Sequence, residues 1–388
     1  MRRLLRQPSS FLALPIFAAC GLALVTYDFP AAYLDGIFVL SVTMAILMLF
    51  DAFAGERLPA FARFRERHYA GTRQAFVALA FAIAVALACL LDLALFPIAL
   101  ISDPATYATM EGGHEHIRHI SDMCWVLPPI ALLCARSRLL RVVLIGIALA
   151  FPVLVIDRNR LFETLFSLAL VVVLRRDESK PFPWALLAGV ALLGAGVFSV
   201  LGALRSGSIE HVALPFSAIY LAAPQALKWL LLYVTAGPYN FAAILSKEYD
   251  NASFLIHQVV PLSGSVATAG TGIPLDASNI NVGTEFFPFL MALGPAGAVV
   301  AMLALYALLA WSVRLLHPQV SLFALLIFLR VAYVCVMAPF APQAFTWMNF
   351  GFIVLCLVLQ LLAAILPNRH AAPVPCARAD GSLSARSV

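Results

Sequence analysis

Repeated apolar runs, each close to the length that crosses a lipid bilayer, constrain the fold of this chain more than any other feature. A helix needs about 20 predominantly apolar residues to span the hydrocarbon core. With 63% hydrophobic and 12% charged residues, the composition is far from that of a soluble domain, where about 25% of residues are charged. The sequence therefore predicts an all-α polytopic membrane protein with about ten transmembrane helices, at 11–27, 34–53, 74–101, 121–135, 142–156, 161–174, 183–204, 286–312, 319–338 and 349–366.

Basic residues are distributed unevenly between the two sides of these predicted helices. If the N-terminus is cytoplasmic, most of the 25 basic residues fall in cytoplasmic segments, including Arg2, the arginines from Arg57 to Arg73 and those from Arg136 to Arg141. Loops on the cytoplasmic side of membrane proteins are enriched in Lys and Arg. The pattern predicts that both termini are cytoplasmic.

The largest outer segment, 205–285, divides the chain into an N-terminal helix bundle (1–204), C-terminal transmembrane helices (286–366) and a disordered cytoplasmic tail (367–388). Its residues 212–245 are apolar but interrupted by Pro215, Pro224, Gly237 and Pro238. We favour interfacial or re-entrant helices covering a cavity, because the prolines cut the run into short pieces. An extra pair of spans, giving 12 in total, is the alternative.

One arginine lies inside a predicted span. Arg330 interrupts the ninth apolar run, where a charge costs about 2.5–3.5 kcal/mol on an insertion scale. A charged protein partner or an anionic ligand would compensate for that cost. Asp92, similarly deep in the third span, is the predicted protein partner.

Three further arginines lie on the outer side, which should be poor in positive charge. They are Arg158, Arg160 and Arg205, and local pairs with Asp157 and Glu163 account for only part of them. A guanidinium presents a planar fork of donors that suits phosphate. We therefore expect these arginines and Arg330 to bind a phosphate or pyrophosphate group beneath the outer segment.

The segment GGHEHIRHISD, residues 112–122, is the other polar cluster. His116 and His119 share a helical face, but His114 does not. A solvated outer loop is the favoured explanation and a metal site the alternative. No phosphate loop, Asp-x-Asp pair or His-Glu-x-x-His motif occurs in the chain. The sequence predicts no metal site, no cofactor and no nucleic-acid partner.

A polar strip runs directly into the eighth span in NINVGTEFFPFLMALGPAGA, residues 279–298. Asn279, Asn281, Thr284 and Glu285 stand at the mouth of a spanning helix. Such side chains can cap the helix and close the loop, or they can contact a ligand. Both explanations are open at this point.

This strip, with DRNRLFETLFSLAL, LGALRSGS and WLLLYVTAGPYNFAAIL, resembles the Wzy-type oligosaccharide repeat-unit polymerases, the family that includes O-antigen polymerases. The resemblance extends from about residue 34 to residue 366. In the family pattern, an Asn and a Thr precede aromatics, an Asp-Phe-Gly and another Gly. Ala292-Leu293 replaces the Asp-Phe here, and Gly283-Thr284 stands where related O-antigen ligases carry His-Asn. The matching residues are Asn281, Thr284, Phe286, Phe287, Gly294 and Gly297.

The resemblance implies a glycosyltransferase of polysaccharide biosynthesis in the bacterial inner membrane. Its substrate would be a polyprenyl-pyrophosphate-linked oligosaccharide, polymerised on the periplasmic face into O-antigen or exopolysaccharide. Pyrophosphate is a good leaving group, so the implied chemistry is metal-independent and needs mainly charge stabilisation. The implied partners are this lipid-linked oligosaccharide, the lipid bilayer, and a chain-length regulator and flippase of the same pathway.

The implied catalytic residues are Glu285, Arg205 and Arg330. Glu285 would remove the proton of the acceptor hydroxyl, with Asp276 and His211 as weaker candidates, and the two arginines would stabilise the leaving pyrophosphate. Two alternatives stay open: an O-antigen ligase using the same donor, and a lipid-linked glycan transporter, which should show internal repeats not seen here. The implied substrate-binding residues are Arg158, Arg160, Asn279, Asn281, Thr284, Tyr239 and Asn240. Gly294 and Gly297 would let the eighth span pack closely against a neighbour.

Overall fold

The computed structural model describes residues 2–102, 115–206, 212–261, 263, 269–277, 280 and 282–366. Over these residues the regular structure is helical, with one isolated β-bridge between Tyr27 and Phe216. The helices are α1 (Arg2–Leu5), α2 (Ser9–Thr26), η1 (Ala31–Tyr33), α3 (Leu34–Ala54), α4 (Phe61–Glu66), α5 (Arg73–Leu95), α6 (Ala99–Ser102), α7 (Glu115–Ser121), η3 (Asp122–Val126), α8 (Leu127–Cys134), α9 (Arg138–Leu154), α10 (Arg158–Leu174), α11 (Trp184–Ser206), α12 (Ala218–Ala222), α13 (Gln225–Lys247), α14 (Ala252–Val259), α16 (Phe287–Arg314), α17 (Leu322–Met337) and α18 (Trp347–Ile365).

Each of the ten predicted apolar segments is helical, which confirms the all-α polytopic fold class. Among the described residues, seven helical stretches are long and apolar enough to cross a membrane: Ser9–Thr26, Ala31–Ala54, Arg73–Leu95, Ile117–Cys134, Leu227–Lys247, Phe287–Arg314 and Trp347–Ile365. Large apolar side chains point outward from several of them, such as Phe53 with 88% of its surface exposed. A lipid environment suits such surfaces, because their backbone groups are already paired within the helices. The exact number of spans stays a prediction.

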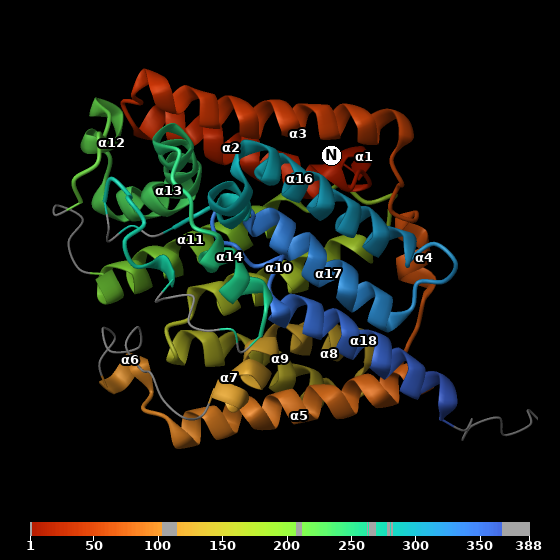
Figure 1. The fold of residues 1–388 in the computed structure, drawn as a ribbon. Coiled ribbons are helices and arrows are strands. Elements are labelled where there is room, and N and C mark those ends of the chain that lie inside the picture. The colour runs from red at the N-terminus through yellow and green to blue at the C-terminus, as the bar shows by residue number, and fades with distance from the viewer. Residues whose placement is uncertain are drawn as a thin grey trace, which may run out of the picture.

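The long helices run side by side between two ends of the molecule (Figure 1). At one end, which we call the basic end, α1, α4, the 315–321 connection and the C-terminus of α18 lie together. Arg6 Nε donates to Leu58 O at 3.0 Å there, and Arg314 Nε pairs with Glu56 Oε1 at 3.0 Å. At the other end, the loop end, lie α12, α13, α14 and residues 338–346. Both ends of the described chain therefore lie at the basic end, and the cytoplasmic location of the termini stays a prediction.

Helix α17 is the centre of the bundle. From Leu322 to Cys335, every residue except Arg330 is buried. A helix that is apolar on all sides is stable only when other helices surround it, and α2, α10, α16 and α18 pack against this one. Arg330 is thus placed by the most enclosed helix of the fold.

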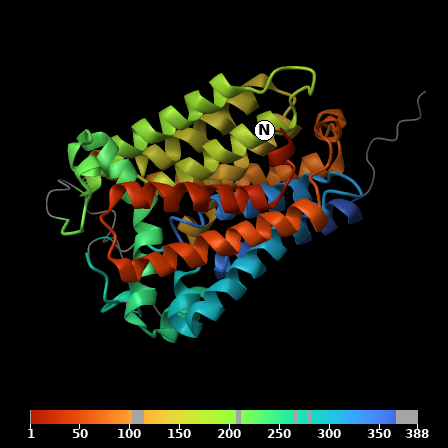
Figure 2. The same cartoon turned by 90° about the horizontal axis from the view of Figure 1, so that it is seen from above.

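The outer segment contains a long helix that was not predicted. We expected prolines to cut residues 212–245 into short pieces, which holds for α12 but is wrong for the continuous α13. Pro238 lies inside α13, and packing against α2, α3, α11 and α16 offsets the hydrogen bond that proline cannot make. Seen from above, α13 runs across the ends of α2 and α3 (Figure 2). The ring centre of Tyr239 in α13 accordingly lies 4.5 Å from the ring centre of Tyr27, the residue that follows α2.

Helix α16 is kinked within the motif that carries the family resemblance. Gly294 has φ +66°, a conformation that glycine adopts without steric cost, and Pro295 follows it. Proline has no N–H, so the carbonyl of Met291 has no partner within the helix and accepts from Asn251 N at 2.8 Å instead. The kink thereby attaches α14 to α16. The prediction of close helix packing at Gly294 is wrong, since a Cβ there would meet no atom within 4 Å.

Candidate functional site

A cavity of about 640 Å³ opens at the loop end, between η3, α10, α14, α17 and α18. One part of its lining is polar and carries Arg160 and Arg330, two of the arginines singled out from the sequence. The other part is aromatic and apolar. Helix α14 and residues 342–348 cover the cavity as a whole. We had expected residues 212–245 to cover it, but none of them lines it.

Arg330 reaches this cavity from the central helix. Its Nη1 pairs with Glu163 of α10, and its Nε donates to Asn349 Oδ1 of α18 at 3.2 Å. Only 13% of its side chain and 3% of that of Glu163 are exposed. The predicted pairing with Asp92 is wrong, because Asp92 accepts instead from Ser121 Oγ at 2.6 Å. A largely enclosed guanidinium thus bridges two helices through one carboxylate and one amide.

Arg160 lies in the first turn of α10 and makes two ion pairs. One joins it to Asp122 in η3, and the other joins its Nε to Asp157 Oδ2 at 3.0 Å. Asp157 also caps α10 by accepting from Arg160 N at 3.1 Å. The local pair of Arg160 with Glu163, which was the alternative to a ligand, is replaced by the pairs above, since Glu163 pairs with Arg330.

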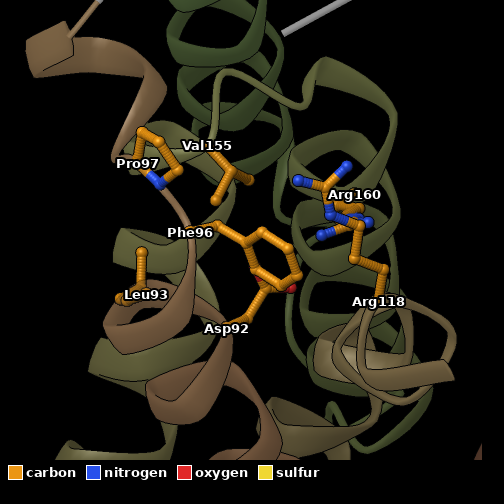
Figure 3. Close-up of a pocket in the computed structure, with 7 residues that line it drawn as sticks. All are labelled: Asp92, Leu93, Phe96, Pro97, Arg118, Val155 and Arg160. Atoms are coloured by element: carbon orange, nitrogen blue, oxygen red, sulfur yellow. The ribbon is translucent and has the colours of Figure 1, made fainter. Parts of the chain in front are cut away.

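Arg160 also lines a second, much smaller cavity (Figure 3). It measures about 10 Å³, close to the space of one water molecule. Asp92, Phe96 and Arg118 line it, and the Arg118 guanidinium stacks 4.4 Å from the centre of the Phe96 ring. Arg160 therefore belongs to a polar layer that continues from the large cavity towards α5.

Carboxylates outnumber guanidiniums in the lining of the large cavity. Arg160 and Arg330 face Asp122, Asp157 and Glu163. The three carboxylates differ in access, because the side chain of Asp122 is 30% exposed and that of Asp157 21%. Asp122 is thus the carboxylate that a molecule in the cavity reaches most easily.

Glu285 anchors the cover of the cavity and does not line it. Its carboxylate accepts from the backbone N–H groups of Gln343, Ala344 and Phe345 at 2.5, 2.8 and 3.1 Å. Burial raises the pKa of Glu285, which precedes α16, to about 7, and these three donors oppose the rise. Gln343 in turn donates from Nε2 to Asn159 Oδ1 at 2.8 Å. The carboxylate oxygens of Glu285 are fully enclosed. We therefore do not retain Glu285 as the base.

Several other predicted substrate-binding residues hold the outer segment together. Arg158 donates to Tyr233 Oη at 2.8 Å and does not line the cavity. Asn240 Nδ2 donates to the carbonyls of Ile280 and Val282 at 2.8 and 2.7 Å, which fixes the polar strip to α13. Thr284, which belongs to this strip, is buried. These positions favour the structural explanation of the strip.

Asp276 is the centre of a clamp at the loop end. It accepts from Lys247 Nζ at 2.6 Å, Tyr239 Oη at 2.7 Å and Tyr33 Oη at 3.0 Å. Burial alone would raise the pKa of Asp276, but the hydrogen bonds from these partners hold it below its ordinary value. Tyr239, predicted to bind substrate, therefore serves this clamp.

Some predicted residues lie outside the described part of the chain. Asn279, Asn281, His211 and His114 are among them, and Arg205 is described only as a position in the last turn of α11. Within the described residues, no three His, Cys, Asp or Glu side chains are grouped as a metal site would require.

The apolar part of the cavity is one face of α18. Trp347, Gly351 and Leu355 recur at a spacing of four and line it together with Phe352. The Trp125 ring of η3 closes this part, with its centre 5.0 Å from that of Phe352. The neighbouring face of α18 carries exposed apolar residues, including Val354 with 58% of its surface exposed. The cavity thus lies directly beside a lipid-facing surface.

Two polar residues were not predicted, namely Asn159, which lines the cavity, and Asn349, which accepts from Arg330 behind it. Asn349 is fully buried in an apolar helix, and Asn159 accepts from Tyr333 Oη at 2.7 Å. Asn349 obeys the rule that identified Arg330, namely a polar residue within an apolar run, and could have been found by it. Asn159, in a short connection, carries no such signal.

Comparisons of the chain with protein-family models, with curated proteins and with solved structures find no match. The family resemblance noted in the sequence therefore stays a prediction.

Proposed function

We propose that this chain is a glycosyltransferase that polymerises polyprenyl-pyrophosphate-linked oligosaccharide repeat units, and that the large cavity holds the donor. The observation that supports this most is the joint placement of Arg160 and Arg330 in one cavity that adjoins the lipid-facing surface of α18. The two residues lie 170 positions apart in the sequence (330 − 160), so the fold brings them together. The same proposal places the chain in the bacterial inner membrane. It also gives the chain a chain-length regulator and a flippase of the same pathway as partners.

The two parts of the cavity suit the two parts of such a donor. Guanidinium groups bind phosphate through paired donors. The ring of Trp347, which is 39% exposed and lines the cavity, offers an apolar surface on which a sugar ring can lie. The polyprenyl chain would leave along Gly351 and Leu355 towards lipid. An amphipathic ligand with one anionic group therefore fits better than a small soluble metabolite.

Binding requires the guanidiniums to exchange partners. The pyrophosphate would replace Asp122 and Glu163 as the partner of Arg160 and Arg330, because a dianionic group added to a site with three carboxylates is otherwise repelled. In the transfer step, the bond between the anomeric carbon and the pyrophosphate oxygen breaks, and the acceptor hydroxyl oxygen bonds to that carbon. The hydroxyl proton passes to the released Asp122 carboxylate, and polyprenyl pyrophosphate leaves with its charge held by the arginines.

Purified protein incubated with lipid-linked repeat units tests this proposal. The wild-type chain should form a ladder of longer products. Arg330→Lys keeps the charge but loses the planar fork, so turnover should fall by about 10²–10³. Asp122→Asn should lower it by about 10²–10⁴, and the exposed Arg314→Lys at the basic end should leave it unchanged. No ladder from the wild type, or full activity of both cavity variants, would contradict the proposal.

One observation favours an O-antigen ligase as the second candidate. His257 of α14 lines the cavity, and its Nδ1 lies 3.2 Å from Ser263 Oγ. A histidine held in this way can act as the base instead of Asp122. The ligase would transfer the glycan once to a lipid A core acceptor, without a ladder, and His257→Ala would abolish that transfer while Asp122→Asn would not.

A further inference from the structure

A second large cavity lies at the basic end, far along the bundle from the candidate active site. It measures about 1010 Å³ and lies between the beginnings of α5 and α9 and the end of α18. We call it the basic-end cavity and define it by Arg67, Arg73, Arg136, Phe76, Leu79 and Leu140. The proposed glycosyl transfer makes no use of it.

The charge of this cavity is one-sided. Arg67, Arg73 and Arg136 line it, and no acidic residue is among its lining residues in the described chain. The cavity proposed to hold the donor, which we now call the loop-end cavity, differs in this respect. There, carboxylates pair with both Arg160 and Arg330. A net positive lining of this kind attracts an anion.

Two features fix the positive groups in place. Gly71 has φ +87°, and the Arg136 guanidinium occupies the position where a Cβ of residue 71 would lie. Arg73 Nη1 donates to Ala364 O at 3.0 Å, which ties the beginning of α5 to the end of α18. Arg136 and Arg73 are thus held beside the cavity by the turn at Gly71 and the end of α18.

The helix ends reinforce this charge. Thr72 caps α5 by accepting from Ala75 N at 3.2 Å, and Ser137 caps α9 by accepting from Leu140 N at 3.4 Å. Both caps line the cavity, so the positive ends of two helix dipoles lie beside the arginines.

The opposite wall is apolar and continues to the lipid-facing surface. Phe76 is 68% exposed, and Leu79 and Leu140 lie beside it in the lining. Next along α9, Leu139 and Val142 are 74% and 67% exposed. A ligand that places a phosphate on the arginines would therefore lay an apolar chain along this wall.

We propose that the basic-end cavity binds an anionic phospholipid of the adjacent leaflet, with its phosphate on Arg67 and Arg136 and an acyl chain on Phe76 and Leu79. Charge complementarity selects the anionic headgroup, and the apolar wall selects a lipid over a free phosphate. Basic pockets between transmembrane helices bind such headgroups in this way.

Native mass spectrometry of the purified full chain with added lipids tests this site. Phosphatidylglycerol should bind in preference to phosphatidylcholine. Arg136→Gln should weaken its binding about fivefold and Arg67→Gln/Arg136→Gln about 25-fold, given the attraction of each basic residue. Arg138→Gln is the matched control, because Arg138 is exposed on the first turn of α9 but does not line the cavity.

Three results would overturn the proposal. Equal binding of phosphatidylcholine would show that the charge selects nothing. Competition by glycerol 3-phosphate at the same concentration as the lipid would show a site for a free phosphate. An equal loss in Arg138→Gln would show a general effect of surface charge. Thermal unfolding in neutral detergent verifies that each variant is folded, and the single Arg136→Gln variant decides the matter if the double variant is unstable.

Discussion

Replacing both partners of the Arg330–Glu163 pair with apolar residues separates the structural role of Arg330 from its proposed role in binding. The pair is almost enclosed, with 13% and 3% of the two side chains exposed. Breaking a buried ion pair by removing one partner costs about 3–5 kcal/mol, because the other charge is left uncompensated. Glu163→Leu should therefore lower the free energy of unfolding by about that amount.

The double variant Glu163→Leu/Arg330→Met should regain most of this loss. No charge is left unpaired in it, and apolar replacements of buried pairs are often neutral. The remaining cost is the bond from Arg330 Nε to Asn349 Oδ1, whose loss leaves a buried acceptor and costs about 1–3 kcal/mol. Thermal unfolding in detergent measures these differences, with the exposed Arg314→Met as a control that should cost at most about 1 kcal/mol.

Polymer formation by the same variants decides between the two roles. If Arg330 holds the donor pyrophosphate, the stable double variant should form no ladder. A double variant that is both stable and fully active would refute our reasoning, because Arg330 would then serve the fold alone. A loss below about 1 kcal/mol in Glu163→Leu would refute the enclosed ion pair itself.

Two further predictions concern the clamp and the apolar part of the loop-end cavity. Since the folded-state pKa of Asp276 lies below its ordinary value, the stability it contributes is present above about pH 4 and is lost as the pH falls through the folded-state value. Asp276→Asn should accordingly unfold at a lower temperature than the wild type at pH 7, and a difference that persists undiminished at the lowest pH would contradict this. Gly351→Leu should keep the thermal midpoint but lower polymer formation about tenfold or more, because a Cβ at this lining position would meet no atom within 4 Å and the longer side chain would extend into the cavity. Gly146→Leu, which is equally open on α9, should leave activity unchanged.

The helices and two arginines of the loop-end cavity could be predicted because each is marked by its own place in the sequence. Apolar length predicts a membrane helix, and a charge within an apolar run or in an outer connection stands out against it. The partners could not be predicted. Glu163 meets Arg330 because α10 and α17 are neighbours in the bundle, and apolar runs carry no information about which helices are adjacent.

The polar strip shows a second limit of sequence reasoning. Glu285 was predicted to be a base because it stands at a helix mouth, but its oxygens accept three backbone N–H groups from residues 343–345. A buried backbone N–H needs a hydrogen-bond acceptor, and a carboxylate can fill that need as readily as it can contact a ligand. A carboxylate at the mouth of a helix looks the same in the sequence whether it binds a ligand or fixes a loop.

Photo-crosslinking of the donor to the protein tests the central claim most directly. A polyprenyl pyrophosphate with a photoactivatable group near its pyrophosphate end would be irradiated with the purified chain, and the labelled peptides mapped by mass spectrometry. We predict labelling in residues 347–355 of α18 and 123–125 of η3, with labelling reduced in Arg330→Lys. Labelling confined to other segments, or labelling of 347–355 that Arg330→Lys leaves unchanged, would contradict the account.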